Sequence, residues 1–276
     1  MPKLAQSYEN DGFVFPVDIV SETEAFELLS DLETAEAELA SQPDKLAALY
    51  AYPDRLLPSF DKLIRHPRLI AAASEILGPD LIVWSASFFD KSAHSSKIVS
   101  WHQDLTYWGL DEAEEVTAWV ALSPTNIASG CMCFVPGSHK HNLVKHVDTF
   151  AENNLLTRGQ EIAVEVNDED SVAIELKSGQ ASLHHGHLFH SSGPNTTANR
   201  RIGAAIRFIK PSMRQRSGDK TLVALVSGED HFQHFEIADS PADRLLDEDF
   251  ERCRKDTEIK RRVLYEGAEG QTGTRY

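Results

Sequence analysis

Apolar residues recur at helical spacing through most of the first third of the chain. Ser21, with Glu24 three residues later, forms a capping-box pattern that predicts the start of a helix. A second helix is predicted from Pro67 to Gly78, because proline favours the first helical position and glycine commonly follows the last turn. We therefore expect a helical N-terminal layer over about residues 1–79.

The pattern changes after Pro79, where short apolar or alternating runs are separated by Gly, Pro, Asn and Ser. Many short strands with such turn signals are typical of an antiparallel sandwich or barrel. Helical spacing returns over residues 241–265, and the Gly- and Thr-rich tail 266–276 is expected to be loose. The predicted strands are Leu81–Phe89, Val116–Leu122, Met132–Val135, Ile162–Val166, Val172–Leu176, Gln180–His184 and Arg201–Ile209.

These patterns predict one domain over residues 1–276, mainly β with flanking helices. Its β core spans about residues 80–210, and a C-terminal helical cover with the loose tail spans about 211–276. The segment 40–60, with two tyrosines and three prolines, is interpreted as a loop. The sequence leaves open whether this loop forms a lid.

Composition narrows the class of protein. The chain has 276 residues, is 41% hydrophobic and 25% charged, and carries a net charge of −16. It can therefore bury a sizeable core but offers no broad phosphate-binding surface, so neither nucleic acid nor an anionic membrane is expected as a partner. No apolar run approaches the roughly 18–20 residues of a membrane helix, and no signal-peptide pattern is seen. Three cysteines are too few for a disulfide scaffold, which favours the cytoplasm.

Twelve histidines are the unusual feature, and most lie in three segments: 94–102, 139–146 and 184–190. His102 and Asp104 are two positions apart, so in an extended segment both side chains reach the same side while Gln103 points away. One imidazole and one carboxylate are two members of a 2-His-1-carboxylate Fe(II) site. The pair alone also fits a salt-bridged pair in a solvent-exposed loop.

A third metal ligand has to come from far along the chain, from a strand beside the first pair. The segment 184–190 holds four histidines, each of which alone is more often structural than a ligand. Arg201 opens the apolar run Arg201–Ile209, where a charge is costly unless it is paired, and its planar guanidinium suits a bidentate carboxylate. Arg200 competes for this role, because a shift of one residue turns a side chain to the other face of a strand.

Another constellation lies between these two. The run Ser129–His139 predicts a buried strand that ends in a Pro-Gly turn. Cys131 and Cys133 lack the second cysteine pair of a zinc site and are interpreted as small core residues. Histidines and lysines at 139–146 form a local positive island, which is either a solvated loop or an anion-recognising part of a substrate pocket.

Together and in this order, these pieces resemble the phytanoyl-CoA dioxygenase family of Fe(II)/2-oxoglutarate oxygenases. The resemblance covers about residues 5–210 and implies a double-stranded β-helix core, the jelly-roll or cupin-like fold. It also implies Fe(II), 2-oxoglutarate and O2 as cofactor and cosubstrates. The matching motifs are Tyr8–Phe13, His102-Gln103-Asp104, Thr117-Ala118-Trp119, Gly130-Cys131 through Pro136-Gly137-Ser138-His139, His190-Ser191-Ser192-Gly193-Pro194-Asn195, and Arg201.

The resemblance also implies roles for individual residues. The iron ligands would be His102, Asp104 and His190. Arg201, eleven residues after His190, would pair with the distal carboxylate of 2-oxoglutarate. Ser192 would help to seat that carboxylate, and Trp119 would flank the cosubstrate. Asp104 decides between two chemistries, since halogenases that resemble this family lack the carboxylate and bind a halide in its place. The resemblance therefore implies a hydroxylase that releases succinate and CO2.

The substrate pocket is less defined. Alternation puts Arg207 on the inward face of its strand, where it either clamps a substrate anion or is a buried ion-pair partner. With His139 and Arg158, it indicates a small anionic or zwitterionic metabolite, and an aminoalkylphosphonate-type compound is the specific candidate. Trp108 and Tyr107, close to the iron motif, either cage a quaternary ammonium or pack in the core.

Four alternatives stay open. The same chemistry on an acyl-CoA or other lipid-derived substrate is disfavoured by the absence of a basic surface for its phosphates. A cupin-like metal enzyme without 2-oxoglutarate would show no succinate release coupled to substrate oxidation. An iron halogenase conflicts with Asp104, and a non-catalytic metal-binding or sensor relative conflicts with the intact set of ligands. The sequence does not indicate the oligomeric state.

Overall fold

The computed structural model describes residues 4–149, 151, 153–156 and 159–264, so Arg158 and the tail 266–276 lie outside the described residues. Its strands form a seven-stranded sheet in the order β1-β9-β4-β11-β2-β12-β13, a four-stranded sheet in the order β3-β10-β5-β8, and the pair β6-β7. The strands are β1 (Phe13–Asp18), β2 (Leu81–Lys91), β3 (Val99–His102), β4 (Glu115–Ala121), β5 (Met132–Phe134), β6 (His146–Asp148), β7 (Gln160–Ile162), β8 (Val172–Ile174), β9 (Gln180–His184), β10 (His190–Ser192), β11 (Arg201–Ile209), β12 (Leu222–Ser227) and β13 (Glu236–Ile237). The helices are α1 (Leu4–Asp11), α2 (Glu22–Glu38), α3 (Pro43–Ala51), α4 (Pro53–Leu56), α5 (Pro58–Ile64), α6 (Pro67–Leu77) and α7 (Asp247–Leu264).

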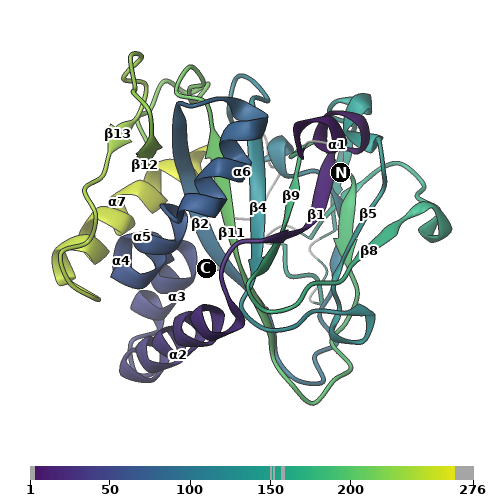
Figure 1. Cartoon of the computed structure of the whole chain (residues 1–276), viewed down its shortest axis with the longest axis horizontal. Coiled ribbons are helices and arrows are strands. Elements are labelled where there is room, and N and C mark those ends of the chain that lie inside the picture. Colours follow the sequence, from purple (N-terminus) through teal and green to yellow (C-terminus); the bar gives the residue numbers. More distant parts are fainter. Residues whose placement is uncertain (1–3, 150, 152, 157–158, 265–276) are drawn as a thin grey trace.

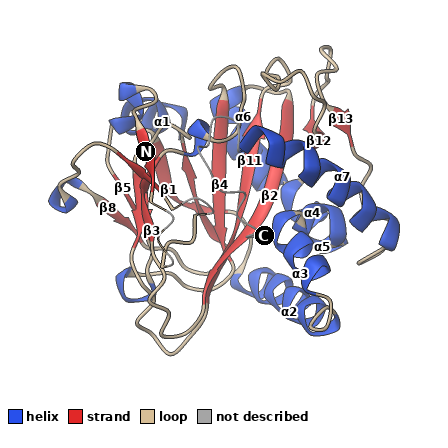
Figure 2. Cartoon of the chain, turned by 180° about the vertical axis from the view of Figure 1, so that it is seen from behind, coloured by secondary structure: helices blue, strands red, loops and turns tan. Residues whose placement is uncertain are grey.

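The large sheet separates a helical layer from the small sheet, as Figure 1 shows. Figure 2 shows the same arrangement from behind, with helices α2 to α7 gathered beside β2 and the small sheet at the other end. The predicted fold, mainly β with flanking helices, is confirmed. The jelly-roll core is considered below with the relatives.

Strand β11 lies at the centre of the large sheet and is buried along its whole length. Its even-numbered residues from Ile202 to Phe208 pack in the core that the sheet shares with the helices. Ala205 instead packs with Trp119 and Met132, in a second apolar cluster that joins the two sheets. The alternation predicted for Arg201–Ile209 therefore sends Arg201, Gly203, Ala205 and Arg207 between the sheets, where the site lies.

Two helix starts follow the sequence pattern. The Ser21 side chain accepts a hydrogen bond from the backbone N–H of Glu24, and the Glu24 carboxylate accepts one from the backbone N–H of Ser21, so the capping box is complete. Helix α6 begins at Pro67 and ends at Leu77, with Gly78 as the C-cap. Helix α6 packs against β4 and β2, whereas α2 packs against α5 within the helical layer.

The N- and C-terminal layers contain strands that the sequence analysis did not assign. Strand β1, Phe13–Asp18, lies in the range expected to be helical and pairs with β9 at the edge of the large sheet. Strands β12 and β13 lie beyond residue 210 and extend the opposite edge. Each is short and gains its stability from pairing with a distant strand, which local spacing does not reveal.

The segment 40–60 is helical, so its interpretation as a loop is wrong. Each of its three prolines, Pro43, Pro53 and Pro58, stands at the start of a short helix. Proline lacks an N–H that the first turn leaves unpaired anyway, so it begins a helix as readily as it interrupts one. Leu56 and Phe60 lie in the main hydrophobic core, and the segment is therefore part of the packed helical layer.

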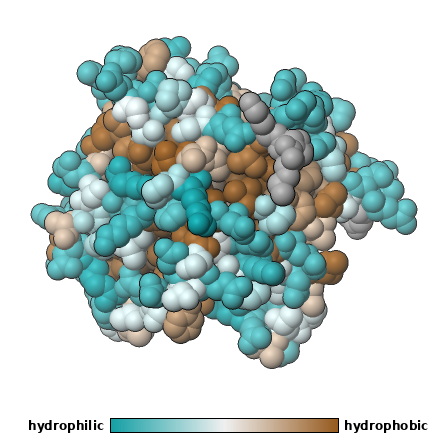
Figure 3. Space-filling model, in the orientation of Figure 1, coloured by the Kyte–Doolittle hydropathy of each residue, from teal (hydrophilic) through white to brown (hydrophobic). Residues whose placement is uncertain are grey.

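One face of the molecule is mostly hydrophilic. Figure 3 shows hydrophilic side chains around most of one face, with apolar side chains gathered toward its middle. Among the described residues, no helix combines the length and the apolar character needed to cross a membrane.

Candidate metal centre

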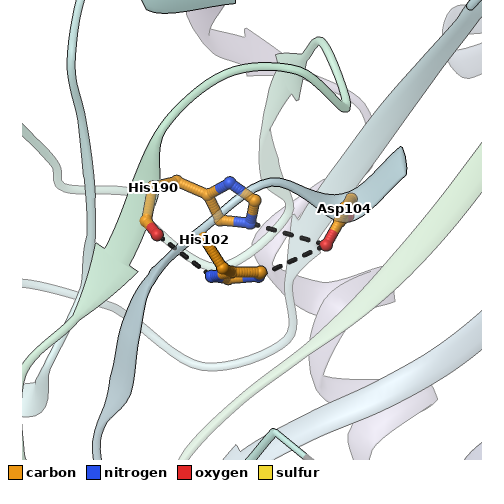
Figure 4. Close-up of side chains that lie close together, drawn as sticks. All are labelled: His102, Asp104 and His190. Atoms are coloured by element: carbon orange, nitrogen blue, oxygen red, sulfur yellow. Dashed lines mark hydrogen bonds and ion pairs between the residues drawn. The ribbon is translucent and has the colours of Figure 1, made fainter. Parts of the chain in front are cut away.

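The small sheet brings the predicted ligands together from two distant parts of the sequence. His102 is the last residue of β3, and His190, the first residue of β10, lies directly opposite it in the antiparallel pair. Asp104 begins a short 3-10 helix immediately after β3. Figure 4 shows the three side chains facing one point, and they form the one cluster in the described part of the chain whose His, Cys, Asp or Glu ligand atoms are close enough to hold a metal ion.

Backbone carbonyls orient both imidazole rings. His102 Nδ1 lies 2.9 Å from the carbonyl oxygen of Ser100 and 3.1 Å from that of His190, and His190 Nδ1 lies 3.0 Å from the carbonyl oxygen of Leu188. The Nε2 atoms then lie 3.3 Å (His102) and 3.7 Å (His190) from one carboxylate oxygen of Asp104. A carbonyl partner that fixes the remote ring nitrogen is the usual support for a metal-binding imidazole.

Burial and neighbouring charges keep His190 neutral and Asp104 ionised, which are the protonation states in which each can bind a cation. Burial lowers the pKa of His190 well below its usual range, so the ring is neutral. Burial opposes ionisation of Asp104, but the polar contact with His102 and the positive charge of Arg207 outweigh it and hold the pKa of the carboxyl below its usual range. Two imidazoles and one carboxylate are the donor set that suits Fe(II) with positions left open, so these residues fit the metal.

The three side chains open onto a pocket of about 500 Å³, which includes the space at its mouth. The pocket lies between the two sheets, and its remaining lining comes from both of them. Of the sequence-predicted residues, those that line it are His102, Asp104, Trp119, His190, Ser192, Arg201 and Arg207.

Arg201 is buried in this pocket, and no carboxylate in the described part of the chain pairs with it. Its side chain packs over the ring of Trp119, with 4.5 Å from the guanidinium carbon to the ring centroid. Its Nε has no hydrogen-bond partner among the described residues, and burial lowers its pKa to about 10. A buried guanidinium that lacks a hydrogen-bond partner at Nε favours the binding of an anionic ligand. The negative charge of the ligand would offset part of the free energy that burying the guanidinium costs.

Gly203 leaves the space that the Trp119 ring fills. A Cβ at position 203 would lie 2.2 Å from Trp119 Cζ2, so Gly203→Ala is expected to push the ring away from Arg201. We expect a loss of about 1–3 kcal/mol in the free energy of unfolding, the usual cost of overpacking, together with weaker 2-oxoglutarate binding. Thermal unfolding and calorimetric titration measure the two effects. Gly193→Ala is the matched control, because its Cβ would meet no atom within 4 Å, and equal effects of both variants would contradict the prediction.

Lys91 is a pocket-side residue that the sequence analysis missed. It pairs with Arg201 across β2 and β11, and its Nζ donates to the Ser192 hydroxyl at 2.5 Å and to the carbonyls of Ser192 and Gly193. Burial, and then the charge of Arg201, lowers its pKa to about 7. The Ser192 hydroxyl, predicted to seat a carboxylate, is therefore also the acceptor for a buried lysine. The signal in the sequence was the position of Lys91 at the end of a strand-like run of polar and apolar residues.

Three predicted substrate residues lie outside the lining that the described residues give the pocket. Trp108 stacks on Trp84 with 5.1 Å between ring centroids, and Tyr107 packs edge-on against His146. His139 faces the N-terminal helix α1 instead, where its Nε2 is 3.2 Å from the carbonyl oxygen of Glu9. Trp108 still approaches the pocket indirectly, because its ring centroid is 5.5 Å from the guanidinium carbon of Arg207.

Gln103, between two of the ligands, points away from the metal site as alternation predicted, and it fastens the surrounding loops. It is fully buried. Its side-chain nitrogen donates to the carbonyls of Asn142 and His187 at 2.6 and 2.7 Å, and its oxygen accepts from the backbone N–H of Val144. Part of the basic segment 139–146 is thus an anchor for the metal-binding strand.

A second anchor, also missed in the sequence, is the buried carboxyl of Glu115. Its Oε1 accepts the backbone N–H of Gly186 at 2.5 Å, and the carbonyl of Gly186 accepts the N–H of Leu105. Burial raises the pKa of Glu115 well above its usual range. Glu115 therefore ties the turn before His190 to the segment that carries Asp104.

Two mainly antiparallel sheets around a 2-His-1-carboxylate cluster define the class of mononuclear non-haem iron oxygenases. The chain belongs to the phytanoyl-CoA dioxygenase family, since the family profile described as "Phytanoyl-CoA dioxygenase (PhyH)" matches residues 8–203. The family resemblance found in the sequence is confirmed. At the level of the family, so are the dioxygenase class and the use of iron and 2-oxoglutarate.

Curated relatives carry several different substrates in their names. An ectoine dioxygenase of Bordetella parapertussis is 30% identical over 148 residues, which cover 49% of this chain and 48% of that protein. An ectoine dioxygenase of Streptomyces avermitilis is 25% identical over 225 residues, 74% of this chain and 76% of that protein. A probable alpha-ketoglutarate-dependent hypophosphite dioxygenase of Stutzerimonas stutzeri is 26% identical over 181 residues, 64% and 62%. The chain thus matches about half the length of the first of these relatives.

Solved structures extend the likeness over nearly the whole chain. The apo form of the non-heme monooxygenase ThoJ has 31% identity and a TM-score of 0.86, with 95% of this chain and 98% of that chain covered. Its nickel complex has 29% identity and a TM-score of 0.80, with 95% and 99% covered. CytC3 with Fe(II) and alpha-ketoglutarate, at 19% identity and a TM-score of 0.65 over 86% and 92%, shares the fold. The predicted jelly-roll core is confirmed by these neighbours.

Proposed function

We propose that the protein is an Fe(II)- and 2-oxoglutarate-dependent dioxygenase that hydroxylates a C–H bond of a small polar metabolite and releases succinate and CO2. One observation carries this proposal: the cluster of His102, Asp104 and His190 faces the same pocket as the buried Arg201, which pairs with no carboxylate of the described residues. The family and the neighbour that contains Fe(II) and alpha-ketoglutarate support it. Residues 1–276 act as one oxygenase domain, because helices and large sheet share one hydrophobic core.

The chain's own residues bind and orient the reactants. His102 and His190 offer their Nε2 atoms, and Asp104 supplies the negative charge. Arg201 holds the distal carboxylate of 2-oxoglutarate, with Ser192 beside it and the ring of Trp119 along its flank. The bound iron, 2-oxoglutarate and O2 supply the oxidising chemistry, while the buried pocket excludes water from it.

Asp104 favours hydroxylation over halogenation. A halide needs the coordination position that a carboxylate would fill, and in this chain the carboxylate oxygen lies within 3.3 and 3.7 Å of the two imidazole nitrogens. An iron halogenase is therefore the less favoured function.

A cytoplasmic location fits the free thiols at positions 131, 133 and 253.

An anionic or zwitterionic metabolite fits the pocket better than an acyl-CoA does. Arg207 lines the pocket and adds a second positive charge to it, whereas the chain as a whole carries a net charge of −16 and so offers no basic surface for the phosphates of coenzyme A. Ectoine and hypophosphite, in the names of relatives, are small and polar. An aminoalkylphosphonate-type compound is one candidate of this class.

Anaerobic reconstitution with Fe(II) and 2-oxoglutarate, followed by addition of O2, tests the proposal. Succinate formation is measured against a panel of aminophosphonates, betaines and amino acids, with an acyl-CoA as the opposing substrate. We expect at least one small polar compound to raise succinate formation above the uncoupled rate, with hydroxylated product in equal amount. Stimulation by the acyl-CoA alone would contradict the substrate class, and turnover without succinate would contradict the reaction.

A further inference from the structure

One row of polar side chains crosses the floor of the pocket and takes no part in binding iron or the cosubstrate as proposed above. Arg207 of β11 lies opposite Thr117 of β4, and Thr117 lies opposite His184 of β9. Directly opposite residues on neighbouring strands project to the same face of a sheet. All three line the pocket, so three adjacent strands present a guanidinium, a hydroxyl and an imidazole side by side.

Two members of this row are buried polar groups that find no partner among the described residues. Thr117 is 1% and His184 is 2% exposed. Thr117 Oγ1 and His184 Nδ1 have no hydrogen-bond partner within the part of the chain that the structure describes. Such groups cost free energy in a folded protein unless a ligand or water satisfies them. Two of them, side by side in one pocket, indicate that the row receives a ligand with hydrogen-bond acceptors.

The guanidinium in the row is held in place by the neighbouring strand. Arg207 Nη1 donates to the hydroxyls of Ser87 at 2.9 Å and Ser85 at 3.3 Å, both on β2. Its guanidinium carbon lies 5.8 Å from the ring centroid of Phe89 and 5.5 Å from that of Trp108. A planar cation fixed between aromatic rings is preorganised for an oxyanion.

This row is separate from the position expected for 2-oxoglutarate. Arg201 and Arg207 are six residues apart on one strand, which separates their Cα atoms by roughly 20 Å at the usual rise of a β-strand. His184 lies beside the metal cluster, with 5.2 Å between its ring centroid and that of His190, whereas Arg207 lies far along the strand from Arg201. A five-carbon diacid that bridges the metal ligands and Arg201 therefore does not extend to Arg207, which can bind a different molecule.

Resting on the proposed function, we infer that Arg207, Thr117 and His184 bind the carboxylate of a monoanionic substrate and so fix which of its carbons faces the metal. The row has one guanidinium, which matches an anion of one negative charge better than a dianion. Around it the pocket is apolar, with Met132, Leu156 and Ala205 in its lining. Within the class of small polar metabolites proposed above, the row therefore favours compounds that carry a carboxylate beside apolar carbons over the phosphonate candidate.

The test uses hexanoate as the probe, with hexanamide and hexylphosphonate as matched uncharged and dianionic probes. Each is titrated anaerobically into the full-length protein loaded with Fe(II) and 2-oxoglutarate, and the change in the visible absorption of the iron–keto-acid complex reports binding. Hexanoate is expected to bind more tightly than both analogues. Arg207→Gln is expected to weaken hexanoate binding roughly 30- to 100-fold, as for a charge-assisted pair, and Thr117→Val about fivefold, as for one neutral hydrogen bond.

Three controls separate the inference from its alternatives. Thr117→Val removes an unpaired buried hydroxyl, so its melting temperature should stay equal or rise while hexanoate binding weakens. Arg214→Gln, at an exposed ion pair with Asp111, should leave hexanoate binding unchanged. Arg207→Gln should leave the Kd of 2-oxoglutarate unchanged.

Equal binding of hexanoate and hexanamide, or tighter binding of hexylphosphonate, would overturn the inference. So would an Arg207→Gln variant that loses 2-oxoglutarate affinity, whereas failure of the unmodified protein to bind Fe(II) and 2-oxoglutarate would overturn the proposed function instead.

Discussion

Replacing Asp104 by alanine is expected to abolish Fe(II) binding and, with it, all succinate formation. The carboxylate is the one anionic member of the cluster, and both imidazole Nε2 atoms lie within 3.7 Å of a single one of its oxygens. Without it, two imidazoles remain, and we expect the Fe(II) affinity to fall by at least 100-fold, since loss of even a supporting partner of a metal ligand costs about 10- to 100-fold. Anaerobic Fe(II) titration measures the effect.

The fold should survive this change. Asp104 lies in a short turn on the pocket side, and the surrounding loops are held by Gln103 and Glu115 rather than by the carboxylate. The circular dichroism spectrum of the variant is therefore expected to match that of the unmodified protein. Asp247→Ala removes an exposed carboxylate paired with Lys45 and should bind Fe(II) normally. Retention of Fe(II) at full affinity by Asp104→Ala would show that the ligand set has been assigned wrongly.

Replacing Arg201 by alanine is expected to raise the KM for 2-oxoglutarate by roughly 100-fold, because truncating one partner of a buried charge pair commonly costs about 2–5 kcal/mol. At saturating 2-oxoglutarate the kcat should fall much less, since the Fe(II) ligands are unchanged. The side chain is 3% exposed, and no described carboxylate pairs with it, so its removal should not reduce stability. Steady-state succinate formation at varied 2-oxoglutarate measures the split.

Arg200 provides the matched control. It is the neighbouring arginine, but it points to the helical side, where it pairs with Glu36 at 2.7 Å and with Asp90 at 3.3 Å. Arg200→Ala is therefore expected to lower the melting temperature and to leave the KM for 2-oxoglutarate unchanged. The opposite pattern, with the KM raised by Arg200→Ala and unaffected by Arg201→Ala, would contradict the assignment.

Much of the metal site was predictable because its residues lie in local motifs. The spacing of His102 and Asp104 and the alternation after Arg201 each need only a few neighbouring residues. The choice of His190 among four histidines came from the family resemblance rather than from spacing. In the structure, His190 lies opposite His102 across β3 and β10.

The parts that sequence reasoning missed depend on contacts between distant segments. Lys91 acquires its place from its register with Arg201, 110 positions away, which no local pattern contains. Strand β1 exists because the edge of β9 is available to it. The prolines of the segment 40–60 begin helices because a buried apolar layer stabilises those short helices, and the same residues in an exposed segment would form turns.

The most direct test of the central claim is an anaerobic titration of the full-length protein with Fe(II) in the presence of saturating 2-oxoglutarate. A keto acid chelated to Fe(II) absorbs visible light, so the titration reports on metal and cosubstrate together. The account predicts saturation at one Fe(II) per chain, an absorption band that requires 2-oxoglutarate, and loss of that band in Asp104→Ala. Absence of Fe(II) binding, or Fe(II) binding with no response to 2-oxoglutarate, would contradict it.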